Sequence, residues 1–292
     1  MPGGAPAFLL RRGSSPLMVS MPHVGTVVPA ELARRMTPVA LTLADTDWHL
    51  PLVYDFLAAL DATVLVATHS RLVIDLNRPP DDENLYPGRD TTGLVPVDTF
   101  RKEPVYRGAA PDAVEIAARH DVYWQPYHAA LADELARLRR RHRRVVLWDA
   151  HSIASELPRF FAGRLTDLNF GTVDGTSCDP ALAAAVLAPV AAQTAYSHVL
   201  NGRFKGGYIT RRHGAPAAGI HAIQLEMSQI IYMDEMPPFA LRTDRSARLR
   251  PLLRECLAAA RDWAGGRPDA AGRLGNPRRR HRPGVPARIT DL

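Results

Sequence analysis

The 292-residue sequence contains only two cysteines, Cys178 and Cys256, and neither belongs to a recognisable motif. A disulfide framework is therefore not expected, and a reducing compartment is the default environment. The N-terminus offers three apolar residues, 8–10, before two arginines, and this order is wrong for a secretory signal peptide. We therefore expect a cytoplasmic protein.

Long apolar runs are also missing. The most apolar stretch, Ala181 to Ala192, is rich in alanine and is interrupted by Pro189. It is well short of the roughly 20 apolar residues that a membrane-spanning helix needs. No association with a membrane is expected.

Excess positive charge is confined to the C-terminal segment 265–292. The formal net charge of the chain is +6, and this segment holds seven arginines and two aspartates, which leaves +1 for the rest. Glycines and prolines surround the arginines, and aromatic residues that could stack on bases are absent there. We expect a solvated, disordered tail and no nucleic-acid partner; a basic arm that contacts RNA or a membrane is the alternative for this segment.

Strand-like and helix-like patterns alternate along the remaining chain, which predicts a single α/β domain over residues 1–264. Strands are expected near 17–20, 62–67, 72–76, 145–148 and 221–227. Helices are expected near 50–60, 120–142, 180–192 and 244–263. Residues 79–111 are rich in proline, glycine and aspartate and lack periodicity, which is typical of a lid or binding loop.

Two histidines follow predicted strands and suggest a metal site. His23 lies in a Pro/Gly-bounded turn after the strand at 17–20, and His151 follows the strand at 145–148. Catalytic groups of α/β proteins collect at the carboxyl ends of strands. Catalytic zinc takes three nitrogen or oxygen ligands from the protein. His23, Asp47 and His151 fit this requirement, with Asp45 and His49 as alternatives to Asp47.

Acidic and basic residues near the other strand ends add further candidates. Asp149 is interpreted as a hydrogen-bond partner of a ligating histidine. Glu226 interrupts an apolar strand, so it is either an outward-facing residue of an edge strand or a general base beside the metal. Asn77 and Arg78 follow the expected strand at 72–76, and an arginine there can bind a carboxylate through two hydrogen bonds. These residues together indicate a carboxylated substrate.

Six blocks of the sequence strongly resemble the N-formylglutamate deformylase family, in the order that the family has them. They are Ser20–Thr26, Asp45–His49, Ser70–Arg78, Asp149–Ser152, Phe204–Arg211 and Gln224–Gln229. The resemblance extends from about residue 8 to residue 262 and leaves the tail unexplained. It implies an amidohydrolase related to the zinc carboxypeptidases and aspartoacylases, with a three-layer αβα domain around a mixed sheet.

The resemblance also implies a cofactor, a substrate and a set of roles. Zinc, or another divalent metal, is the implied cofactor, and a small dianionic N-acyl amino acid is the implied substrate. The related enzymes bind zinc through a His-x-x-Glu motif, but Thr26 stands three residues after His23, so Asp47 is assigned as the carboxylate ligand. The implied reaction is hydrolysis of N-formyl-L-glutamate to formate and L-glutamate, a step of histidine degradation.

The remaining roles follow from this resemblance for Glu226, Asn77 and Arg78, and are our own assignments for Arg71 and for the γ-carboxylate. Glu226 is expected to act as the base and Arg71 as the donor to the developing oxyanion. Asn77 and Arg78 are expected to bind the α-carboxylate. Arg211 is expected to bind the γ-carboxylate, with Lys205 or Arg203 as substitutes, although Arg211–Gly214 lacks the tyrosine expected before the glycine. A deacylase for another N-acyl amino acid and a metal-free binding protein are the alternative functions, and the oligomeric state is left open.

Overall fold

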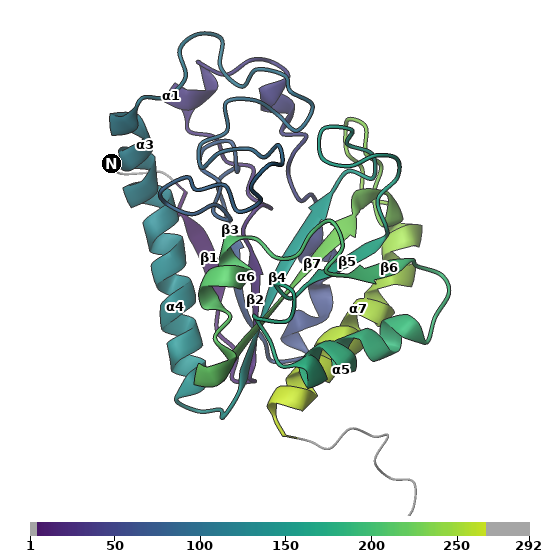
Figure 1. Ribbon diagram of the computed structural model, residues 1–292. Helices are drawn as coiled ribbons and strands as arrows, with labels where there is room; N and C mark the ends of the chain where they lie inside the picture. The colour runs from purple at the N-terminus through teal and green to yellow at the C-terminus, as the bar shows by residue number, and fades with distance from the viewer. Residues whose placement is uncertain (1–4, 267–292) are drawn as a thin grey trace, which may run out of the picture.

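The computed structural model describes residues 5–266 of the chain (Figure 1). All but the first two residues of the expected basic tail lie outside the described residues. None of the described helices is both long enough and apolar enough to cross a bilayer. Cys178 and Cys256 are both buried free thiols, as the absence of a disulfide motif predicts.

A seven-stranded mixed sheet forms the centre of the domain, in the spatial order β1-β3-β2-β4-β7-β5-β6. The strands are β1 (Phe8–Arg11), β2 (Leu17–Met21), β3 (Thr63–Ala67), β4 (Val145–Ile153), β5 (Leu168–Gly171), β6 (His198–Leu200) and β7 (Ile220–Ser228). Strands β3, β2, β4 and β7 are mutually parallel, whereas β1 and β5 run antiparallel to their neighbours β3 and β7. The predicted mixed sheet is therefore confirmed.

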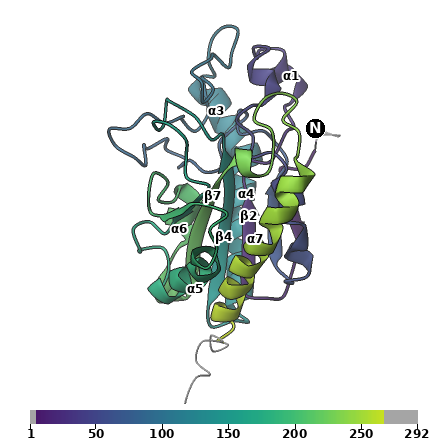
Figure 2. The ribbon, with the colours of Figure 1, turned by 90° about the vertical axis from the view of Figure 1, so that its right-hand side faces the viewer.

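Helices cover both faces of this sheet, because successive side chains of each strand point in opposite directions. On β4, Leu147 packs toward α4 (Gln125–Arg139), whereas Trp148 packs toward α5 (Pro180–Ala191) and α7 (Thr243–Ala264). Figures 1 and 2 show α4 and α7 on opposite sides of the strands. The expected αβα layering is thus present, while the relation to the zinc carboxypeptidases stays a prediction.

The shorter helices are α1 (Ala30–Ala33), α2 (Leu50–Val53), α3 (Ala113–Arg119) and α6 (Tyr208–His213). The helix expected near 50–60 is divided into α2 and a 3₁₀ turn, Asp55–Ala58. The helix expected near 120–142 begins earlier, because α3 continues through a π-helical turn, His120–Trp124, directly into α4.

The prediction of a strand at 72–76 is wrong. Its side chains are buried, but they enter two different clusters: Val73 packs beside Met36, and Leu76 packs against α4. The backbone forms turn hydrogen bonds instead of a ladder, since Val73 N donates to Ser70 O and Asp75 N donates to Leu94 O. The segment is therefore a buried loop.

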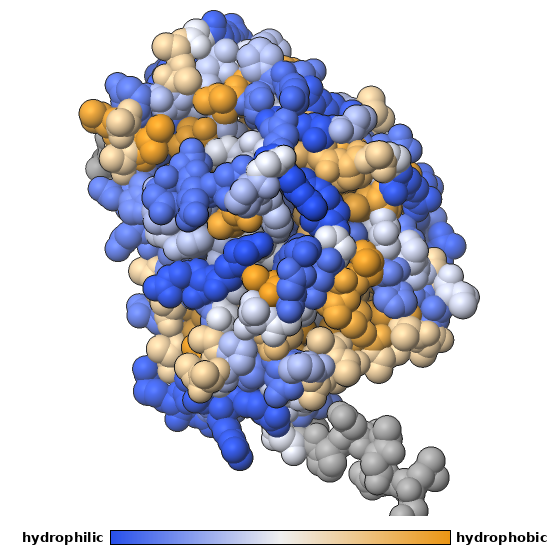
Figure 3. Space-filling view, viewed as in Figure 1, coloured by the Kyte–Doolittle hydropathy of each residue, from blue (hydrophilic) through white to orange (hydrophobic). Residues whose placement is uncertain are grey.

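Long loops gather at the carboxyl ends of the parallel strands. In Figure 1 the segments 22–47 and 70–112 lie together above the ends of β2, β4 and β7. The surface that they form on this face is mostly hydrophilic, with apolar residues in separate patches (Figure 3). This is the edge of the sheet where catalytic groups are expected.

Candidate active site and metal centre

His23, Asp47 and His151 converge at this edge. His23 follows β2, Asp47 lies in the loop before α2, and His151 lies within β4. All three are buried, and their potential ligand atoms lie within 4.8 Å of one another. Asp47 Oδ2 is 3.2 Å from His151 Nδ1 and 3.8 Å from His23 Nδ1. Two imidazole nitrogens and one carboxylate oxygen therefore face a common point.

The chemistry of this cluster fits a divalent metal ion. Asp47 Oδ1 is buried and accepts no hydrogen bond from the described part of the chain. Asp75, Asp149 and Glu226 are also buried nearby, and Arg71 forms an ion pair with Asp75, with 2.5 Å between Arg71 Nη2 and Asp75 Oδ2. A buried excess of negative charge is unfavourable unless a cation offsets it. Histidine and aspartate are ligands that catalytic zinc uses.

The two alternatives to Asp47 point elsewhere. Asp45 Oδ2 accepts a hydrogen bond of 2.8 Å from Phe100 N. His49 Nε2 lies 2.6 Å from Phe239 O and is not part of the cluster that joins the two histidines. Of the three candidates, Asp47 is therefore the residue that joins the two histidines.

Each histidine also contacts a second carboxylate through its other ring nitrogen. His23 Nε2 is 2.7 Å from Asp75 Oδ1, and His151 Nε2 is 3.2 Å from Asp149 Oδ1. Such partners fix the ring orientation and the tautomer of metal-ligating histidines. Asp149 thus lies where it was expected. Asp75 was missed, although its place in the Ser70–Arg78 block was an available signal.

The carboxylates shift the ionisation of this cluster. Burial lowers the pKa of His151, but Asp149 and Asp47 outweigh burial and raise that pKa well above its usual value. Burial lowers the pKa of His23, and the nearby Arg71 guanidinium adds to this effect. Burial raises the pKa of Asp75, but Arg71 and His23 outweigh it and hold that pKa well below its usual range.

Glu226 faces the same cluster because of the strand register. It pairs with His151 across β4 and β7, so both side chains point to the same side of the sheet. The edge-strand interpretation of Glu226 is wrong, since β7 lies between β4 and β5. Burial is the main cause that raises the pKa of Glu226 to about 8. A carboxyl group with such a raised pKa is suited to proton transfer near neutral pH.

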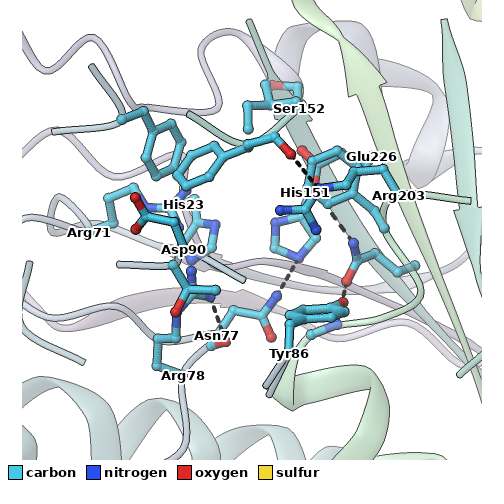
Figure 4. Close-up of a pocket in the computed structure, with 17 residues that line it drawn as sticks. His23, Arg71, Asn77, Arg78, Tyr86, Asp90, His151, Ser152, Arg203 and Glu226 are labelled. Atoms are coloured by element: carbon cyan, nitrogen blue, oxygen red, sulfur yellow. Dashed lines mark hydrogen bonds between the residues drawn. The ribbon is translucent and has the colours of Figure 1, made fainter. Parts of the chain in front are cut away.

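A cavity opens beside the two histidines (Figure 4). Arg71 and Arg78 lie on the side of His23, whereas Arg203 and Glu226 lie on the side of His151. The other described residues that line the cavity include Asn77, Tyr86, Asp90, Phe100, Ser152, Phe160, Phe204 and Gln224. The cavity therefore places cations on both sides of the candidate metal centre.

Asn77 and Arg78 are held in place by neighbouring backbone groups. Arg78 Nε donates to Thr92 O at 2.8 Å, and Asn77 Oδ1 accepts from Ile209 N at 2.8 Å. Gly207 permits this close approach of α6, because a Cβ atom at this position would lie 2.3 Å from Asn77 Nδ2. Asn77 Nδ2 lies 3.1 Å from His151 Nε2.

The three cations considered for the second carboxylate differ in position. Arg203 lines the cavity, and its Nε donates to Phe160 O at 2.7 Å. Lys205 lies near the surface, 2.9 Å from Asp174 Oδ2. Arg211 Nε donates to Gly206 O at 3.0 Å. Neither Lys205 nor Arg211 is among the described residues that line the cavity.

The fold and the site together define an α/β protein whose candidate metal centre faces an arginine-lined cavity. Residues 15–233 match the N-formylglutamate amidohydrolase family. The chain belongs to this family, which confirms the resemblance found in the six sequence blocks.

Two named relatives and one solved structure agree with this membership. The chain is 50% identical to an N-formylglutamate deformylase of Pseudomonas aeruginosa over 87% of this chain and 95% of the relative. It is 47% identical to an N-formylglutamate deformylase of Pseudomonas putida over 86% of this chain and 94% of the relative. A crystal structure of N-formylglutamate amidohydrolase from Ralstonia eutropha is similar with a TM-score of 0.75 and 25% identity, covering 89% of this chain and 97% of that one.

Proposed function

We propose that the protein hydrolyses N-formyl-L-glutamate to formate and L-glutamate, as a step of histidine degradation in the cytoplasm. The observation that carries this proposal is the position of the His23–Asp47–His151 cluster and Glu226 between arginines on two sides of one cavity. The identity to two N-formylglutamate deformylases over most of the chain supports the same substrate. The cations match a substrate with two carboxylates.

His23, Asp47 and His151 would hold zinc, with another divalent metal ion as the alternative. When bound, zinc supplies a Lewis acid that polarises the formyl carbonyl group and lowers the pKa of water. Asp75 and Asp149 would keep the two imidazole rings oriented through their outer nitrogens.

Glu226 is the proposed general base. Its carboxylate would accept a proton from the water that attacks the formyl carbon, and would then donate this proton to the departing amine nitrogen. Such proton transfer contributes about 10²–10⁴-fold to catalysis. Arg71 lines the cavity, and its Nε finds no acceptor within residues 5–266. Arg71 would donate to the formyl oxygen as negative charge develops there.

The two substrate carboxylates would bind on opposite sides of the metal centre. Asn77 and Arg78 would bind the α-carboxylate on the side of His23. Arg203 replaces Arg211 and Lys205 as our first candidate for the γ-carboxylate, because it lines the cavity on the side of His151. The aromatic rings of Phe100 and Phe160, which contact each other and line the cavity, would limit the access of water to the bound substrate.

A substrate panel tests this function. The purified protein is expected to release formate from N-formyl-L-glutamate with a higher kcat/KM than from N-formyl-L-glutamine. Its kcat/KM for N-formyl-L-glutamate should also exceed its kcat/KM for hydrolysis of N-acetyl-L-glutamate. A higher kcat/KM for the acetyl substrate would identify a different deacylase. Binding of N-formyl-L-glutamate without product would identify a binding protein.

The same panel tests the role of Arg203. Arg203→Ala is expected to lower kcat/KM for N-formyl-L-glutamate by about 30-fold or more, since loss of a desolvated charge partner costs about 2–5 kcal/mol. Activity on N-formyl-L-glutamine should change much less, so the preference between the two substrates collapses. Lys205→Ala is the matched control and should keep the parent ratio. An unchanged ratio in Arg203→Ala would contradict the assignment and direct the test to Arg211.

A further inference from the structure

The π-helical turn His120–Trp124 changes which side chains share a face of the α3–α4 helix. In an α-helix, five residues pass a full turn by about 140°, because one turn takes 3.6 residues. In a π-helical turn, hydrogen bonds join residues i and i+5, so residues five apart lie one above the other much as residues four apart do in an α-helix. Arg119 and Trp124 therefore lie on the same face, and His128 follows one α-helical turn later.

These three buried side chains donate to the same loop. Arg119 Nη1 is 2.9 Å from Val73 O, His128 Nε2 is 2.8 Å from Leu76 O, and Trp124 Nε1 is 3.0 Å from Arg78 O. Burial is the main cause that lowers the pKa of His128 to about 3, so its ring is neutral at physiological pH and donates through Nε2–H.

Residues 73–78 pair with no strand among residues 5–266, so their buried carbonyl groups need hydrogen-bond donors from elsewhere. It carries much of the candidate active site. Asp75 contacts His23 and Arg71, and Asn77 contacts His151. A shift of this backbone would move these side chains and Arg78 relative to the candidate metal centre.

We propose that Arg119, Trp124 and His128 are positioning residues, which the π-helical turn aligns so that they fix the backbone of residues 73–78 beneath the substrate. This inference rests on the proposed function, because it assigns the loop a role in binding N-formyl-L-glutamate. Neither Trp124 nor His128 is among the described residues that line the cavity. They act through the loop and do not touch the reacting groups.

Trp124→Phe tests the proposal because it keeps an aromatic ring and removes the N–H donor. The expected result is an increase of about tenfold in KM for N-formyl-L-glutamate, with kcat within about threefold of the parent and zinc content unchanged. Trp263→Phe, the same substitution near the end of α7, is the control and should keep the parent KM. An unchanged KM in Trp124→Phe would overturn the role of Trp124.

A second pair of variants separates hydrogen bonding from packing. His128→Gln retains an N–H donor, whereas His128→Phe retains a flat ring that stacks on Trp124 as the imidazole does. The positioning role predicts that the glutamine variant keeps a KM closer to that of the parent. A phenylalanine variant with the better KM would assign His128 a packing role and overturn the proposal for this residue.

Hydrogen exchange provides a readout that does not depend on the reaction. The amides of residues 73–78 are expected to exchange faster in Trp124→Phe than in Trp263→Phe. Equal exchange in both variants would overturn the positioning proposal even if the parent protein is active. Absence of formate release by the parent would instead overturn the proposed function, while faster exchange would still support the positioning of the loop.

Discussion

Asp47→Asn is expected to remove bound zinc and nearly all hydrolysis of N-formyl-L-glutamate while the protein remains folded. Loss of a residue that supports a metal ligand costs about 10–100-fold in affinity, so loss of the ligand itself should exceed 100-fold. Elemental analysis of the dialysed protein measures this effect, and circular dichroism checks the fold.

Asp45→Asn is the matched control. Asparagine retains an oxygen that can accept the hydrogen bond from Phe100 N, and Asp45 does not point at the histidines. This variant should keep its zinc and its activity. Zinc retained in Asp47→Asn but lost in Asp45→Asn would reverse our assignment of the carboxylate ligand.

Glu226→Gln is expected to lower kcat by about 10²-fold or more, with zinc content retained and KM close to that of the parent. Glutamine preserves the shape of the side chain but cannot accept the proton of the attacking water. Steady-state formate release and elemental analysis on one preparation separate these effects.

Glu134→Gln is a suitable control for the Glu226 variant, because Glu134 is another buried glutamate and lies on α4, where it pairs with Arg12 and Arg137. Its kcat should remain within a few-fold of the parent. If kcat of the Glu226→Gln protein also stayed within a few-fold of the parent, Glu226 would have only a structural role, and its role as the base would be contradicted.

Much of the site could be predicted because its residues follow recognisable strands. The apolar run before His151 and the run around Glu226 identified β4 and β7, and the register of parallel strands brings such neighbours together. Asp47 required a choice among nearby polar residues. Only the path of the loop shows that Asp45 points to Phe100 and Asp47 to the histidines.

Other features depend on backbone geometry that composition does not reveal. Residues 72–76 are as apolar as a strand, but their side chains enter two clusters from a turning backbone, which hides the role of Asp75. Which of Arg203, Lys205 and Arg211 reaches the cavity depends on the path of the backbone, which has positive φ angles at Asn201 and Gly206. The π-helical turn was missed because the regular helical spacing of apolar residues begins only at Trp124, where this turn ends.

Removal of the metal tests the central claim most directly. The protein is stripped with a chelator, and formate release from N-formyl-L-glutamate is measured as zinc is returned in known amounts. We predict that the stripped protein is inactive and that activity rises linearly until about one zinc ion is bound per chain. Formate release at the parent rate by protein shown to contain no metal would contradict the account.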